Sequence, residues 1–234
     1  MANFVQIIEI STKMASELNA SQLFSFLTQL AANNNREWFK QHKAQYDTLR
    51  QQWLADVQSL INLIAQWDDS VRGLNVADAV YRIYRDVRFS PDKSPYKTYF
   101  SACFGRGGRH CQSFAHYVHL QPGRSMVGGG VWLPAKDKLR AMRNLIDAEQ
   151  EEFIKIVTNP EFTSRFRFES DSLKRVPRDF PADHPLGEYL KMKEFLVVMH
   201  VDQDYFSTPD WPEKASRDLS ALKPLKDFLD YVYE

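Results

Sequence analysis

The sequence has few cysteines, no net charge and no long apolar run. Two cysteines among 234 residues cannot form the disulfide framework of a secreted scaffold. Thirty Lys and Arg balance thirty Asp and Glu, which argues against a protein whose whole surface follows nucleic acid or anionic lipid. No apolar run approaches the roughly 18 residues of a membrane span, and the N-terminus does not resemble a secretory signal. We therefore expect a cytoplasmic protein without a membrane partner.

The composition is that of a folded domain. Hydrophobic residues make up 44% and aromatic residues 13% of the chain, and a domain of this length buries roughly 70% of its unfolded surface. Disorder of the whole chain is therefore excluded. Since repeats and linkers are missing, we expect one domain over residues 21–234. We expect a flexible extension over residues 1–20, with a short edge strand as the alternative and Met1 and Met14 as alternative starts.

Helical periodicity is clear near the N-terminus. Apolar residues recur every three or four positions over 21–31 and again over 38–64. Asn34 lies three residues before Glu37, which is the spacing of a capping box and predicts a long helix from there to about Trp67. Further helices are predicted over 134–157, over 185–192 and after residue 212.

Strand-like alternation begins at Val80. In residues 80–89 the odd positions form a mostly apolar face and the even positions a charged face. Further strands are predicted over 99–104, 114–121, 125–133 and 195–201. Helices on both sides of a cluster of strands predict an α+β fold, in which a mainly antiparallel central sheet packs against a long N-terminal helix and C-terminal helices.

Positive charge is concentrated in the middle of the chain. Residues 80–125 contain eight Lys and Arg but only two acids, so this segment carries a formal charge of +6 and the remainder −6. Arginine side chains bind phosphate or carboxylate oxygens in a bidentate manner, and tyrosine adds a hydroxyl donor and a ring. We therefore expect a sheet pocket that binds an anionic small ligand, such as a phosphate-containing metabolite or a nucleotide. The predicted ligand-binding residues are Arg82, Tyr84, Arg85, Arg88, Lys93 and Lys97.

Three residues are candidates for chemistry at this site, although the sequence does not decide whether the protein is an enzyme. Asp86 is embedded in the basic segment, where it would orient an arginine or ligate a divalent ion. His119 shares strand parity with Tyr117 and Gln121, so it would be a general base if that face also carried Arg82. Tyr84 is the third candidate.

Two other interpretations of the basic segment remain open. The same residues could form a backbone track in a nucleic-acid-binding module. Alternatively, the protein is a non-catalytic interaction or scaffold protein whose basic residues are paired internally. Arg85, on the apolar face of its predicted strand, would then pair with Glu37 or Asp86.

Motifs for a metal or cofactor are weak. Cys103, Cys111 and His110 match no zinc pattern, so no metal site is predicted. The loop from Gly105 to Gly108 is not followed by a helix, so it does not predict dinucleotide binding, and no cofactor is identifiable. The triplet 128–130 consists of glycines, which would permit close approach either by a ligand or by a neighbouring aromatic ring.

Four segments carry a resemblance to a known family. They are NNNREWF at 33–39, YRIYRDVRFS with DKSPYKT over 81–98, GGGVW at 128–132, and LKRVP with DHP over 173–185. Together they are similar to a bacterial family of unknown function, DUF2461, over about Leu23 to Tyr231. The resemblance implies one soluble domain but no reaction. The first twenty residues depart from it.

Overall fold

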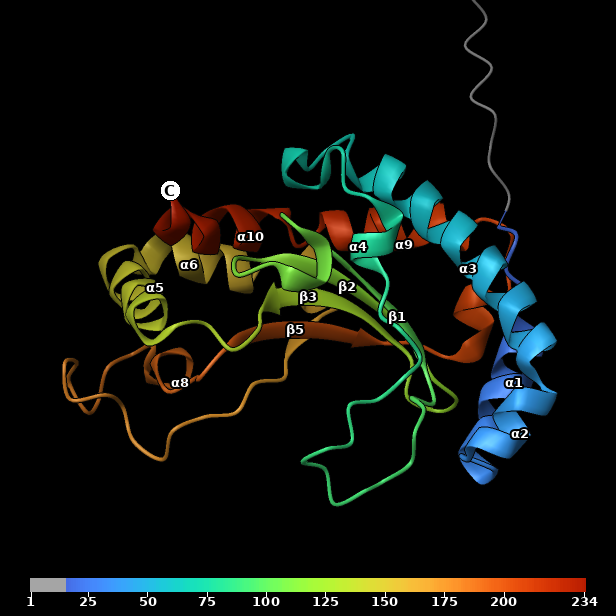
Figure 1. The fold of residues 1–234 in the computed structure, drawn as a ribbon. Coiled ribbons are helices and arrows are strands. Elements are labelled where there is room, and N and C mark those ends of the chain that lie inside the picture. Colours follow the sequence, from blue (N-terminus) through green and yellow to red (C-terminus); the bar gives the residue numbers. More distant parts are fainter. Residues whose placement is uncertain (1–15) are drawn as a thin grey trace, which may run out of the picture.

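The fold is built around an antiparallel sheet of five strands. The computed structural model describes residues 16–234, in which the strand order is β1-β2-β3-β5-β4. The expected α+β fold with a mainly antiparallel sheet is confirmed (Figure 1). The strands predicted over 99–104, 114–121, 125–133 and 195–201 correspond to β1, β2, β3 and β5. The bounds are β1 Phe100–Phe104, β2 Ala115–Leu120, β3 Met126–Val131, β4 Arg167–Phe168 and β5 Phe195–His200.

Helices precede and follow the strands along the chain. The N-terminal group comprises α1 Ala20–Ala32, α2 Arg36–Gln41, α3 Lys43–Ile64 and α4 Val76–Ala79. The later helices are α5 Lys136–Ala148, α6 Gln150–Val157, α7 Pro160–Thr163, α8 Gly187–Leu190, α9 Trp211–Ser220 and α10 Lys223–Asp230. Short 3₁₀ helices are η1 Asp69–Val71, η2 Gly108–His110, η3 Gln203–Phe206 and η4 Tyr231–Tyr233. Within residues 16–234, none of the helices combines the length and apolar character needed to cross a membrane.

The long helix predicted from Asn34 is two helices, α2 and α3, separated at His42. The cap of α2 is Asn35, whose side-chain oxygen accepts from the Trp38 N–H at 2.9 Å. The capping role predicted for Asn34 is therefore wrong. The Asn34 amide instead donates to the Tyr96 carbonyl at 2.9 Å and accepts from the Tyr96 N–H at 3.1 Å. Asn34 thus connects the N-terminal helices to the segment that leads into β1.

Most of the extension expected over residues 1–20 lies outside the described residues, which begin at Ser16. The Ser16 hydroxyl and the Glu17 N–H both donate to the Asp56 carboxylate of α3, at 2.5 and 2.8 Å. Leu18 is buried. The Trp211 indole donates to the same carboxylate at 2.8 Å. Asp56 therefore connects the start of the described chain with α3 and α9.

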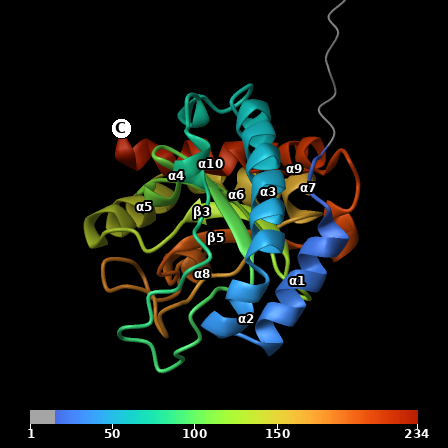
Figure 2. The same ribbon diagram turned by 45° about the vertical axis from the view of Figure 1, so that its right-hand side comes forward.

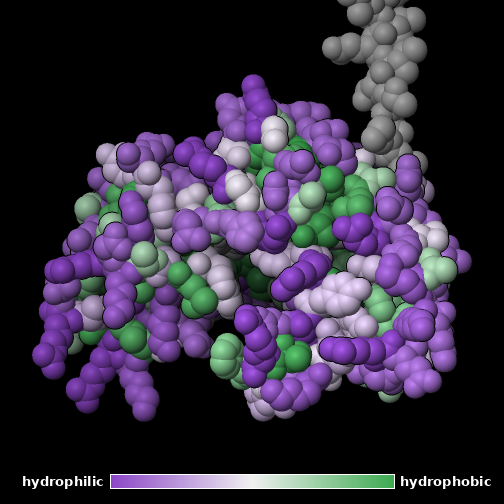
Figure 3. Space-filling view, viewed as in Figure 1, coloured by the Kyte–Doolittle hydropathy of each residue, from purple (hydrophilic) through white to green (hydrophobic). Residues whose placement is uncertain are grey.

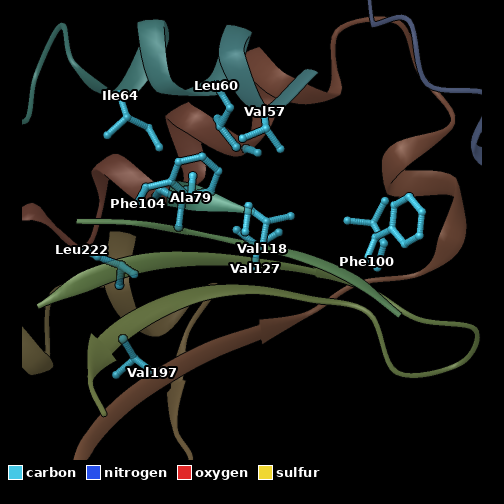
Figure 4. Close-up of a cluster of buried hydrophobic side chains, with 14 of the residues drawn as sticks. Val57, Leu60, Ile64, Ala79, Phe100, Phe104, Val118, Val127, Val197 and Leu222 are labelled. Carbon is cyan, nitrogen blue, oxygen red and sulfur yellow. The ribbon is translucent and has the colours of Figure 1, made fainter. Parts of the chain in front are cut away.

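One face of the sheet is buried beneath helices. Figures 1 and 2 show α3, α9 and α10 on the same side of the strands. Figure 4 shows side chains from both layers meeting there, and each such burial stabilises the fold by about 1.5–3 kcal/mol. The labelled members from α3 are Val57, Leu60 and Ile64, and those from the strands are Phe100, Phe104, Val118, Val127 and Val197.

The strand predicted over residues 80–89 is wrong. These residues form only isolated bridges, Val80 with Ala102 and Tyr84 with Tyr96. The chain folds back on itself, so that the Arg85 N–H donates to the Pro95 carbonyl at 2.9 Å. Prolines at 91 and 95 supply no N–H for a ladder, which prevents a regular hairpin. We call residues 81–98 the 81–98 loop; it extends below β1 in Figure 1.

The Arg85 guanidinium organises the interior of the 81–98 loop. It donates to the Asp92 carboxylate at 2.5 Å and to the Ser94 carbonyl at 3.0 Å. The partners predicted for Arg85, Glu37 and Asp86, are therefore wrong. The sequence placed Arg85 among the apolar positions of a predicted strand. In the structure its side chain binds acceptors inside the loop, because a half-buried guanidinium needs several of them.

Replacing Arg85 with Met should loosen the 81–98 loop without unfolding the domain. Phe89, which is 95% exposed in this loop, should then be cleaved faster by chymotrypsin because the loop opens more often. Mass spectrometry of the fragments measures the rate of this cleavage. Arg106→Met, which removes an exposed cation outside the loop, is the control. Equal cleavage rates in the two variants would show that Arg85 does not hold the loop.

A buried ionic cluster joins the end of α3, β2 and α10. The His116 Nε2 lies 3.0 Å from the Asp68 carboxylate, and the Lys226 ammonium lies 3.3 Å from Asp68 and 3.0 Å from Asp230. Burial raises the pKa of Asp68, but hydrogen bonds from His116 and Ser70 and the Lys226 charge outweigh it and lower that pKa strongly. Burial lowers the pKa of His116, so the imidazole is neutral and donates from Nε2.

The lowered pKa of His116 predicts a loss of stability on acidification. Below the unfolded value of 6.5, the unfolded chain binds a proton at this position that the folded protein does not bind. The free energy of unfolding should therefore fall with decreasing pH by up to about 1.4 kcal/mol per pH unit for this residue. Urea unfolding at several pH values between 7.5 and 5 measures this slope. His116→Gln, which can still donate to Asp68, should have the shallower slope; an unchanged slope would refute the assignment.

Candidate functional site

The second face of the sheet carries small and polar side chains. Ser101 and Cys103 of β1 lie opposite His119 and Tyr117 of β2, and Tyr117 is also paired with Gly128 of β3. We call these five residues the open face, because α3, α9 and α10 lie on the other side of the strands. Figure 3 shows a hollow in the surface below the sheet, between the 81–98 loop and residues 170–185.

Close contacts within the protein explain the three glycines of β3. A Cβ at Gly128 or Gly130 would lie 2.2 or 2.0 Å from a carbonyl oxygen of β5. A Cβ at Gly129 would lie 2.8 Å from the Phe114 ring. Of the two explanations open at the sequence level, the neighbouring aromatic ring applies to Gly129. The other two glycines allow the close approach of β5, which the sequence did not indicate.

Three tyrosines and a histidine form a continuous layer on the open face. The Tyr99 and His119 rings are 4.4 Å apart between centroids, and the Tyr117 and His119 rings are 5.9 Å apart. Tyr81 contacts Tyr117 edge to face at 6.2 Å. Burial is the main cause that raises the pKa of Tyr81 to about 12 and also raises that of Tyr117. We call Tyr81, Tyr99, Tyr117 and His119 the tyrosine layer; its hydroxyls remain protonated at neutral pH.

Lys97 lies over the tyrosine layer without an acidic partner. Its ammonium is 5.0 Å from the Tyr81 ring centroid and 5.7 Å from that of Tyr99, distances typical of cation–π contacts. Burial, followed by the positive charge of Arg82, lowers the pKa of Lys97. Within the described residues, neither Lys97 nor Arg82 forms an ion pair. Two cations therefore repel each other here, an arrangement that a bound anion would stabilise.

His119 occupies the centre of a hydrogen-bond chain. Its Nε2 lies 3.0 Å from the Gln121 side-chain oxygen, and its Nδ1 lies 3.0 Å from the Tyr117 hydroxyl. Because an amide oxygen only accepts, Nε2 carries the proton and Nδ1 accepts from Tyr117. The Gln121 amide continues the chain to the Thr98 hydroxyl at 3.4 Å. Burial lowers the pKa of His119, against the Gln121 hydrogen bond, which raises it.

The other predicted basic residues lie along the 81–98 loop and have partners within the protein. Arg88 pairs with Asp86 at 2.7 Å on the exposed surface, and this hydrogen bond lowers the pKa of Asp86 to about 2. Lys93 donates to the Val87 carbonyl at 3.0 Å. Arg85 is bound inside the loop, as described above. The structure thus brings together Lys97, Arg82 and His119, and places Arg85, Arg88 and Lys93 in contacts with the loop.

Tyr84 and Asp86 lie apart from the tyrosine layer. The Tyr84 ring contacts Phe39 of α2 at 6.2 Å and Tyr96 at 5.5 Å between centroids, and its side chain is about half exposed. The Asp86 carboxylate is occupied by Arg88. Of the three residues predicted to carry chemistry, only His119 therefore belongs to the layer beside Lys97.

A metal centre finds no support in the described part of the chain. Residues 16–234 contain no cluster of three or more His, Cys, Asp and Glu side chains suited to a metal ion. Both cysteines are free. Burial raises the pKa of Cys103 to about 12, so this thiol is a poor nucleophile and a poor ligand at neutral pH.

Sequence reasoning did not assign Tyr81, Tyr117 and Gln121 to the site. For Tyr117 and Gln121 a signal exists, because they alternate with His119 along β2 and so share its face. No comparable signal exists for Tyr81, whose position depends on how the start of the 81–98 loop lies against β1. Its backbone N–H donates to the Ser101 carbonyl at 3.1 Å, which brings its ring over the sheet.

Removing the Tyr117 hydroxyl should raise the pKa of His119. The hydroxyl donates to the Nδ1 lone pair and so stabilises the neutral imidazole. NMR titration of the histidine side chains in Tyr117→Phe measures the change, with His119→Asn to assign the signal. Tyr99→Phe retains the ring that contacts His119 and is the control. An unchanged or lower pKa in Tyr117→Phe would contradict this proton arrangement.

Comparison with known proteins gives one match. Residues 22–228 match the model of the family described as conserved hypothetical protein (DUF2461). No curated protein and no solved structure matches the chain. The family match covers nearly the whole sequence, including the four segments that carried the resemblance. The chain therefore belongs to the DUF2461 family.

Proposed function

We propose that the open face binds a small anionic ligand, phosphate-like or nucleotide-like, with Lys97 and Arg82 as its cationic groups. The observation that carries the proposal is the half-buried Lys97 ammonium, which lies on two tyrosine faces and has no carboxylate partner among the described residues. A desolvated charge is costly unless it is paired. A bound anion would supply the missing partner and would benefit from the second cation, Arg82.

The recessed position of the tyrosines favours a small ligand over a nucleic-acid strand. Tyr81, Tyr99 and Tyr117 are only partly exposed and contact one another or His119. A surface that binds single strands presents its aromatic rings outward for successive bases. Three of the basic residues that would extend a track along the 81–98 loop, Arg85, Arg88 and Lys93, are already bound within the protein.

The tyrosine layer would also give the site a means of moving a proton. In the neutral state His119 accepts from the Tyr117 hydroxyl and donates to Gln121. A ligand group that gives up a proton to the Tyr117 oxygen would let Tyr117 pass its own proton to the Nδ1 lone pair of His119, which leaves a neutral tyrosine and an imidazolium. If the protein is an enzyme, we propose His119 as its general acid or base and Tyr117 as the group that connects it to the ligand.

Thermal unfolding with a panel of anions tests the proposal. Inorganic phosphate, pyrophosphate, AMP and ATP are compared at constant ionic strength. A ligand at 100 times its Kd stabilises the folded state by about 2.7 kcal/mol, which corresponds to a Tm increase of roughly 5–10 °C for a domain of this size. The increase should disappear in Lys97→Met and decrease in Arg82→Met.

The matched control is Arg88→Met, which also removes one positive charge from the same segment. Because Arg88 is exposed and paired with Asp86, this variant should keep the full ligand-induced increase in Tm. The proposal is refuted if no anion stabilises the protein. It is also refuted if Lys97→Met and Arg88→Met respond alike.

A further inference from the structure

A groove lies on the helical side of the molecule, at α6, α7, α10 and the turn between α9 and α10. Its volume is about 1010 Å³. Apolar side chains line it along its length: Leu145, Ile156, Phe162, Ala221, Pro224 and Phe228. None of the residues of the open face or the tyrosine layer contributes to it, so it is a separate feature.

The charged residues of this groove are mainly acidic. Glu149, Glu152 and Glu161 line it and form no ion pair within residues 16–234. Lys223 and Asp227, which also line it, pair with each other at 2.5 Å. Lys155 is the remaining lining cation. In the described part of the chain, the groove is therefore lined by three carboxylates and one ammonium without ion-pair partners, together with apolar side chains.

Tyr231 adds an exposed aromatic ring to the groove. Its side chain is 67% exposed, and it lines the groove together with apolar residues such as Phe228. Tyrosine combines a large apolar area with a hydroxyl and is enriched among the residues that dominate binding energy at protein interfaces. An exposed tyrosine beside an apolar wall is thus suited to contact a partner chain.

We propose that this groove docks a basic amphipathic helix of a partner protein. The apolar wall would receive the apolar face of the helix, and Glu149, Glu152 and Glu161 would pair with Lys or Arg beside that face. The volume of the groove matches that of a short helical segment. Two turns of an α-helix with side chains, 10–12 Å wide and about 11 Å long, occupy roughly 1000 Å³. The proposal does not depend on the anion site.

Fluorescence anisotropy with the full chain tests the docking proposal. The probe is a labelled 14-residue peptide of Leu and Lys with helical apolar spacing, and its counterpart has Glu in place of every Lys. The basic peptide should bind and the acidic peptide should not. Glu152→Lys should weaken binding of the basic peptide by roughly tenfold, since it replaces an attraction by a repulsion. Tyr231→Ala should weaken it by roughly fivefold or more.

The matched control is Glu151→Lys. Glu151 is the exposed neighbour of Glu152 on α6 but does not line the groove. Both variants change the net charge equally, so non-specific attraction of a basic peptide changes equally in both. Binding that persists unchanged in Glu152→Lys, or that falls as much in Glu151→Lys, would overturn the proposal. Equal binding of the acidic peptide, or a groove blocked by self-association of the chain, would also overturn it.

Discussion

One-sided burial of the sheet is the constraint on which the rest of the structure depends. The apolar side chains of β1, β2, β3 and β5 are buried against α3 and the C-terminal helices, and they belong to the core of the protein. The opposite face is not needed for that core. It carries Tyr117, His119 and the overlying Lys97, and the buried imidazole of His119 is hydrogen-bonded to Tyr117 and Gln121.

The two groups of ionisable side chains near the sheet differ in whether their charges are paired within the protein. On the buried face, His116 and Lys226 both pair with Asp68, which is typical of an architectural cluster. On the open face, Lys97 lies over two tyrosine rings near a second cation and forms no ion pair with any residue from 16 to 234. An unsatisfied charge in a half-buried position is where a ligand would stabilise the protein most, which distinguishes this site from the buried cluster.

The zero net charge of the chain conceals a separation of charge between two surfaces. The segment that forms the 81–98 loop and the strands beside it carries a net charge of +6, against −6 for the rest of the chain. Carboxylates at α6 and α7 that have no ion-pair partner within residues 16–234 line the groove. Because complementary potentials guide association, the two surfaces would select partners of opposite charge. One protein could thus bind an anion on its sheet side and a basic helix on its helical side.

The sequence by itself determined the fold class, four of the five strands, and the family. Periods of two and of three to four residues follow from backbone geometry, so they are visible without the tertiary structure. It also identified the segment that contains Lys97 and placed Tyr117, His119 and Gln121 on one face. Only the tertiary structure decided that residues 80–89 form a loop, that Asn34 binds the Tyr96 backbone, and that Arg85 pairs with Asp92. These contacts join residues whose spacing in the sequence follows no regular period, so periodicity does not predict them. They depend on how the chain folds back on itself around two prolines.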